Sequence, residues 1–260
     1  QCELAEQFYY NDNLHALQWV HFLVSFASVI LCMYTARKYV HKTLFESSTN
    51  ELIIAVYIFC TIHGGAVAFL QILHLSSRYT ASIPCLAQIS NKFCILRMIA
   101  TSSISGFCIL HAGITAQRFE STFNYSFRVQ KITARVFFLA ASVIFAFIAY
   151  HKEPLDGFSP YCSAFIKCKN KVLMLNLYVL LGLDIVNDFA TLALWRYNKI
   201  MLKKERAEYN LEKTFHRKQN IIAIKQFFPV NFIHPITYVA LSFLYERGHK
   251  SRKIGFEWHH

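Results

Sequence analysis

Apolar residues along the chain fall into six blocks separated by polar, mostly basic segments. The blocks cover residues 17–34, 52–75, 94–116, 136–150, 172–195 and 221–245. A helix needs roughly 20 residues to cross the hydrocarbon core of a bilayer, and only the block at 136–150 falls well short of that length. None of the blocks alternates apolar and polar residues as an outer-membrane strand does. The pattern predicts an all-α, polytopic transmembrane helix bundle over residues 1–245, followed by a basic tail at 246–260.

Composition and charge predict how the chain is oriented in the membrane. The chain is 55% hydrophobic and 16% charged, whereas soluble domains carry about 25% charged residues. Of the 27 Lys and Arg residues, 16 lie in the loops after the first, third and fifth blocks, if Lys225 at the start of the sixth block is counted with the last of these loops. Because short cytoplasmic loops retain positive charge, the N-terminus is predicted outside, and membrane lipid rather than nucleic acid is the expected partner of the basic loops. Asn124 begins the only Asn-x-Ser/Thr sequon and lies in a predicted inner loop, so its glycosylation would contradict this orientation.

Cysteines are concentrated on the predicted outer side, where conditions favour disulfides. The five outer cysteines are Cys2, Cys85, Cys94, Cys162 and Cys168. Cys162 is the preferred partner of Cys94, and Cys168 is the alternative partner. Cys85 would then pair with whichever of Cys162 and Cys168 is left. Five thiols leave one over, so the connectivity stays open. The spacings of cysteine and histidine match no zinc site, and no metal or cofactor is expected.

Acidic residues occur inside the fifth apolar block. Asp184 and Asp188 are four residues apart and share a helix face, with Asn187 beside them. A carboxylate at mid-membrane costs about 2.5–3.5 kcal/mol on insertion scales, so these side chains should face the bundle, where His63 or His111 is within reach. Three interpretations remain open: a structural polar network, a receptor switch, or the ion or proton path of a transporter or channel.

The outer halves of the helices offer polar candidates for ligand binding. Gln71, His74 and Arg97 are predicted there among Phe and Tyr residues. Arg97 would anchor an anionic or carbonyl group of a ligand, or else pair with lipid headgroups or with an acid of the segment EPLDG. No cluster of histidines and carboxylates and no nucleophile elbow stands at one depth, so an enzyme is not expected.

Three segments, spread from Cys2 to Ile221, carry specific motifs. Residues 2–10 read CELAEQFYY. In the run CILRMIATSSISGFCILHAGITAQRFESTF, residues 94–123, Cys94 and Arg97 open the motif, and Arg118 and Thr122 close it. The third segment, YNLEKTFHRKQNI, leads into the sixth block and contains Tyr209 and Asn220. In this order they resemble the nematode serpentine chemoreceptors of classes alpha, ab and beta, without separating the three classes.

The resemblance implies a seven-helix G-protein-coupled receptor of the sensory-neuron plasma membrane. Such a receptor binds a small chemical cue on its outer side and activates a heterotrimeric G protein. Only six helices are evident here, so we expect either a fragment or a product that lacks the last helix. The oligomeric state does not follow from the sequence.

The same resemblance assigns G-protein coupling to four residues: Arg118, Gln117, Tyr209 and Asn220. Topology alone favours Arg118 as an ordinary positive-inside side chain at the membrane boundary, and the resemblance favours a switch instead. Gln117 stands where the family has a glutamate. A Glu–Arg lock that holds the resting state would therefore be lost or replaced by a weaker amide contact.

Overall fold

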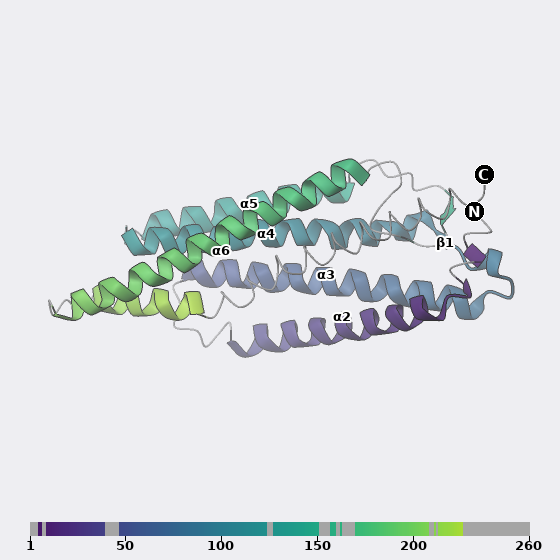
Figure 1. Ribbon diagram of the computed structural model, residues 1–260, viewed down its shortest axis with the longest axis horizontal. Helices are drawn as coiled ribbons and strands as arrows, with labels where there is room; N and C mark the ends of the chain where they lie inside the picture. Colours follow the sequence, from purple (N-terminus) through teal and green to yellow (C-terminus); the bar gives the residue numbers. More distant parts are fainter. Residues whose placement is uncertain are drawn as a thin grey trace, which may run out of the picture. The chain divides into compact units, whose positions relative to one another are not determined.

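A computed structural model describes residues 5–6, 9–39, 47–123, 127–150, 157–159, 162, 170–207, 211 and 213–225. Its long helices are α2 (Asp12–Tyr39), α3 (Ser47–Thr80), α4 (Ile95–Phe123), α5 (Phe127–Tyr150) and α6 (Asn170–Ala207), and residues 213–225 are also helical. Short elements stand between them: the 3₁₀ turns η1 (Pro84–Leu86) and η2 (Asn91–Cys94), and the strands β1 (Ile89–Ser90) and β2 (Phe158–Ser159). The predicted all-α architecture is confirmed (Figure 1).

The helices extend beyond the apolar blocks that predict them. α5 begins at Phe127 rather than at 136 and contains Arg128 and Lys131 in its first turns. α6 continues to Ala207 rather than ending at 195. Hydropathy marks only the part of a helix that lies in hydrocarbon, whereas backbone hydrogen bonding continues a helix into the polar region. The rest of the sixth block, 226–245, and the tail, 246–260, lie outside the described residues.

Four helical segments of the described part are long and apolar enough to cross a membrane. They are Asp12–Arg37, Thr49–Thr80, Asn91–Phe123 and Tyr178–Glu205. In the first of these, Val24 is 62% exposed and Leu31 is 65% exposed. A continuous apolar surface of this kind is typical of a helix that faces lipid.

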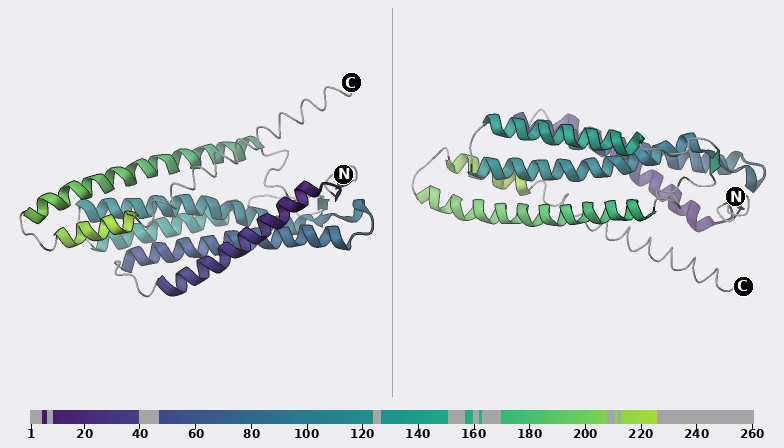
Figure 2. Two further views of the ribbon diagram at one scale, coloured as in Figure 1. Left: turned by 60° about the horizontal axis from the view of Figure 1, so that its bottom comes forward. Right: turned by 90° about the horizontal axis from the view of Figure 1, so that it is seen from above.

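The chain divides into two compact units, each built from helices. The first unit contains Gln1–Leu110 and Ala134–Ile166, and the second contains His111–Thr133 and Lys167–His260. In the first, α2 and α3 run antiparallel and side by side (Figure 1 and Figure 2). β1 and β2 of this unit pair antiparallel. In the second unit, the 213–225 helix runs back beside the C-terminal part of α6 (Figure 2).

Gly64 marks a close approach of α3 to α2 and carries a stability prediction. A Cβ atom there would lie 2.8 Å from Val29 Cγ2 and 3.2 Å from the Ser25 carbonyl oxygen, whereas a Cβ at Gly65 would meet nothing within 4 Å. Both positions gain about 1 kcal/mol of helix propensity on substitution by alanine. Because overpacking typically costs about 1–3 kcal/mol, Gly64→Ala is expected to be less stable than Gly65→Ala by that amount.

Thermal unfolding of the two variants in detergent measures this difference. Gly65→Ala is the matched control because it makes the same chemical change one residue away on the same helix. Equal unfolding midpoints would show that α2 does not restrict position 64.

Candidate functional site

One group of polar side chains in the second unit is almost completely withdrawn from solvent. Its members, called here the Arg118 cluster, are Gln117, Arg118 and Thr122 of α4, Asn198 and Glu205 of α6, and Arg217 and Asn220 of the 213–225 helix. Residues three or four positions apart share a helix face, which explains why α4 presents Arg118 together with Thr122 and why the last helix presents Arg217 together with Asn220.

Arg118 connects α4 to the 213–225 helix. Its Nη1 donates to Asn220 Oδ1 at 3.0 Å, and its Nη2 donates to Gln117 Oε1 at 3.3 Å. Asn220 Nδ2 donates in turn to Thr122 Oγ1 at 3.2 Å. Arg118 is only 4% exposed, so its guanidinium is held by amide oxygens rather than by water. The bond from Arg118 to Gln117 is an amide contact of the kind expected where the family has a glutamate.

Arg217 holds the other half of the cluster. Its Nη1 donates to the Thr122 carbonyl oxygen at 2.9 Å and to Asn198 Oδ1 at 3.0 Å. Its Nε lies 3.3 Å from Glu205 Oε1, in an ion pair whose side chains are 6% and 5% exposed. A buried ion pair depends on further hydrogen bonds to its members. Thr122 and Asn198 accept from Arg217, whereas the second carboxylate oxygen of Glu205, Oε2, is buried and accepts no hydrogen bond from any described residue.

The structure brings together three of the four residues assigned to coupling. Gln117, Arg118 and Asn220 are in contact, and Tyr209 lies outside the described residues. From the sequence, no role was assigned to Asn198, Glu205 or Arg217. Asn198 and Glu205 are seven residues apart, and this spacing places two polar residues on the same helix face.

The outer ligand candidates lie in the first unit. Gln71 and His74 of α3 are 4% and 6% exposed, and Arg97 of α4 is 7% exposed. Gln71 Nε2 lies 3.4 Å from His21 Nδ1. Oε1 of Gln71 is buried and accepts no hydrogen bond from any described residue. A buried acceptor without a donor is costly, by about 1–3 kcal/mol.

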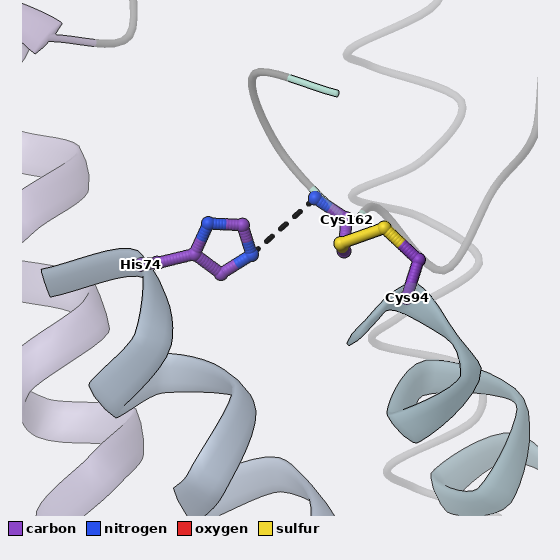
Figure 3. Close-up of a disulfide and its surroundings, with 3 residues drawn as sticks. All are labelled: His74, Cys94 and Cys162. Carbon is purple, nitrogen blue, oxygen red and sulfur yellow. Dashed lines mark hydrogen bonds between the residues drawn. A yellow bond between two sulfur atoms is a disulfide. The ribbon is translucent and has the colours of Figure 1, made fainter. Parts of the chain in front are cut away.

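A disulfide bond closes the chain next to His74. Cys94 and Cys162 are joined, with their Cα atoms 5.2 Å apart and a sequence separation of 68. This is the pairing that sequence analysis preferred. The backbone N–H of Cys162 donates to His74 Nε2 at 3.3 Å, as Figure 3 shows. Cys85 is also disulfide-bonded, and Cys168, its expected partner, lies outside the described residues.

The expected intramembrane polar network is divided between the two units. Asp184, Asn187 and His111, all of the second unit, are 3%, 8% and 1% exposed. His63 belongs to the first unit, where its Nδ1 lies 3.0 Å from the Ala100 carbonyl oxygen. A network that includes Asp184 and Asp188 therefore stays a prediction.

Metal binding has no support among the described residues, where no group of three or more His, Cys, Asp or Glu side chains is placed to hold an ion.

Membrane-type helices, a disulfide at Cys94 just before α4 and a buried arginine near the other end of α4 are the features expected of a receptor of the serpentine type. Residues 3–250 match the family model for the serpentine type 7TM GPCR chemoreceptor Sra. The chain therefore belongs to the Sra family, which selects class alpha among the three classes that the motifs left open, and it is a multi-pass membrane protein.

Two curated relatives from Caenorhabditis elegans agree with this assignment. Serpentine receptor class alpha-39 is 24% identical over 249 residues, which are 91% of this chain and 64% of the relative. Serpentine receptor class alpha-8 is 22% identical over 250 residues, which are 93% of this chain and 74% of the relative. The chain thus spans only part of the length of either relative. No solved structure matches it.

Proposed function

We propose that this protein is a chemosensory receptor that binds a small chemical cue on its outer side and couples to a heterotrimeric G protein through the Arg118 cluster. The observation that carries the proposal is the buried Arg118, which holds α4 to the 213–225 helix through Asn220. Family membership favours the receptor over a transporter or channel built on Asp184 and Asp188. The family is generally not enzymatic.

Coupling would work by exchanging the partners of Arg118. In the arrangement described here its guanidinium donates to two amide oxygens. Neutral acceptors hold a guanidinium less strongly than a carboxylate does, so they keep the two arrangements of a switch within a few kcal/mol of each other. When the helices separate, the released guanidinium becomes available to the C-terminal carbonyls of a partner protein.

Cue recognition is proposed in the first unit, at Gln71, His74 and Arg97. Arg97 supplies a cation for a carboxylate or a carbonyl group, and Gln71 supplies an acceptor oxygen that no described residue satisfies. The Cys94–Cys162 disulfide supports an extracellular position for these residues, because such bonds persist in oxidising compartments. The N-terminus would then be outside, in the plasma membrane of a sensory neuron.

Replacing Arg118 tests the coupling directly. In the full-length receptor, Arg118→Ala is expected to reduce cue-dependent G-protein activation at least about tenfold, because hydrogen bonds to a charged group are worth about 1.5–3 kcal/mol each. The measurement is nucleotide exchange on the G protein in membranes, in response to a panel of small carboxylic acids and ketones.

Arg128→Ala is the matched control, because Arg128 is an exposed arginine near the start of α5. It should leave the response unchanged at equal surface expression. An unaltered response in Arg118→Ala would remove the coupling role.

A further inference from the structure

Two free cysteines meet across the contact of α2 and α3 in the first unit. The Cys32 and Cys60 side chains are hydrogen-bonded to each other, and Cys32 is also hydrogen-bonded to Ser28. Neither cysteine belongs to a disulfide, and both are half-buried. Hydrogen-bonded sulfur atoms are in van der Waals contact, so only a small movement separates them from bonding distance.

The packing of the two helices supports this pairing. Farther along the same contact, Gln71 Nε2 lies 3.4 Å from His21 Nδ1. Cys32 follows His21 by eleven residues on α2, and Cys60 precedes Gln71 by eleven residues on α3. Eleven residues are about three helical turns, so both pairs belong to one line of contact between the antiparallel helices (Figure 2). Gly64, which marks the close approach of α3 to α2, lies between the two pairs.

Both thiols lie inside the membrane-spanning segments. These segments are Asp12–Arg37 and Thr49–Thr80, and Cys32 stands about 7.5 Å along the helix from the end of the first. Structural disulfides are formed in an oxidising aqueous compartment, whose oxidants do not reach a thiol within hydrocarbon. The pair therefore stays reduced until an oxidant enters the bilayer.

The class of oxidant that suits this position is a hydroperoxide. Hydrogen peroxide is small and uncharged, and the hydroperoxides of lipid acyl chains arise within the bilayer itself, so both reach a half-buried thiol there. Cysteines that respond to peroxides are accessible and have a second, resolving thiol beside them. Cys32 and Cys60 have both properties.

We propose that Cys32 and Cys60 form a hydroperoxide-sensitive dithiol, which is oxidised to a disulfide that joins α2 to α3. The Cys32 thiolate attacks the hydroperoxide, and the O–O bond breaks. Cys32 becomes a sulfenic acid, and the departing oxygen takes the proton of Cys32 and leaves as an alcohol, or as water from hydrogen peroxide. The Cys60 sulfur then attacks the sulfenic sulfur, the S–O bond breaks, and the hydroxyl group leaves as water with the Cys60 proton.

The reaction is balanced, because the two thiols lose two electrons and two protons and the hydroperoxide takes up both. Cys32 is the attacking thiol, since Ser28 and Cys60 each carry a donor that stabilises a negative charge on its sulfur. The site is separate from the cue-binding and coupling residues proposed above.

Mass mapping of the chain in nanodiscs tests the site. Hydrogen peroxide is added to the buffer in one arm, and a phosphatidylcholine hydroperoxide is included in the bilayer in the other. After the remaining thiols are blocked with N-ethylmaleimide, a cross-linked peptide pair containing Cys32 and Cys60 is expected, and a phosphine reductant should remove it. The faster arm identifies the source of the oxidant.

Cys108 provides an internal standard, because it is a buried free cysteine of α4. The Cys32–Cys60 cross-link should form at least about tenfold faster than Cys108 is oxidised, because the neighbouring thiol makes the second step intramolecular.

Variants assign the role of each thiol. Cys60→Ser should stop at the sulfenic acid of Cys32, which a dimedone probe labels, and Cys32→Ser should leave Cys60 unlabelled. The matched control is the double variant Leu31→Cys, Cys32→Ser, which moves the thiol by one residue to a position where the side chain is 65% exposed. It should not form the cross-link to Cys60.

The mapping of the wild-type chain requires no variant to fold. Absence of the cross-link in both arms would overturn the proposal, and so would equally fast cross-linking in the double variant. Labelling of Cys60 in Cys32→Ser as strong as that of Cys32 in Cys60→Ser would also overturn it, because the two cysteines would then react independently.

Discussion

Replacing Arg217 by leucine is expected to lower the free energy of unfolding by about 3–5 kcal/mol. The substitution leaves the Glu205 carboxylate buried without its cation, and it also removes the donors to the Thr122 carbonyl and to Asn198. An uncompensated buried charge is far more costly than a lost surface contact. The measurement is the unfolding transition of the purified protein in detergent.

Two controls isolate the effect of burial. Arg78 pairs with Asp12 at 3.2 Å, but the Asp12 side chain is 92% exposed, so Arg78→Leu should cost less than about 1 kcal/mol. The double variant Glu205→Leu, Arg217→Leu should recover much of the stability, because no charge is then left buried alone. If Arg217→Leu were as mild as Arg78→Leu, the Arg118 cluster would not be closed from solvent.

Removal of the Cys94–Cys162 disulfide is expected to cost about 4 kcal/mol. The bond closes a segment with a sequence separation of 68 residues, and the chain-entropy relation gives about that value for a loop of this length. Unfolding of Cys94→Ser and of Cys162→Ser measures the loss. The double variant should be no less stable than either single variant, because one substitution already opens the loop.

Cys32→Ser serves as the comparison, since Cys32 is a free cysteine of α2. It should change the unfolding free energy by less than about 1 kcal/mol. A comparable loss in Cys32→Ser would mean that the decrease comes from exchanging sulfur for oxygen and not from opening the loop.

Within the described residues, the apolar blocks coincide with helices but do not mark where those helices end. The transfer energy of a segment is a sum over its own residues, so an apolar block is visible without knowledge of its neighbours. The ends of α5 and α6 lie in basic sequence, where Arg128 and Lys203 belong to helix just as the apolar residues do. Charge distribution marks the side of the membrane but not the last turn of a helix.

Only those residues of the candidate site that lie in family motifs could be predicted from the sequence. Arg118, Gln117 and Asn220 were identified from segments that resemble the family. The Glu205–Arg217 pair was not, because both residues look like ordinary members of a basic loop until two helices place them 3.3 Å apart.

Helix number, orientation bias, membrane class and family thus follow from local composition and short motifs, because each is a property of a segment taken alone. The burial of Arg118, its contact with Asn220 and the pairing of Glu205 with Arg217 follow from the packing of helices against one another. Hydrogen bonds and cavities join residues that are distant in sequence, so they exist only once the chain has folded.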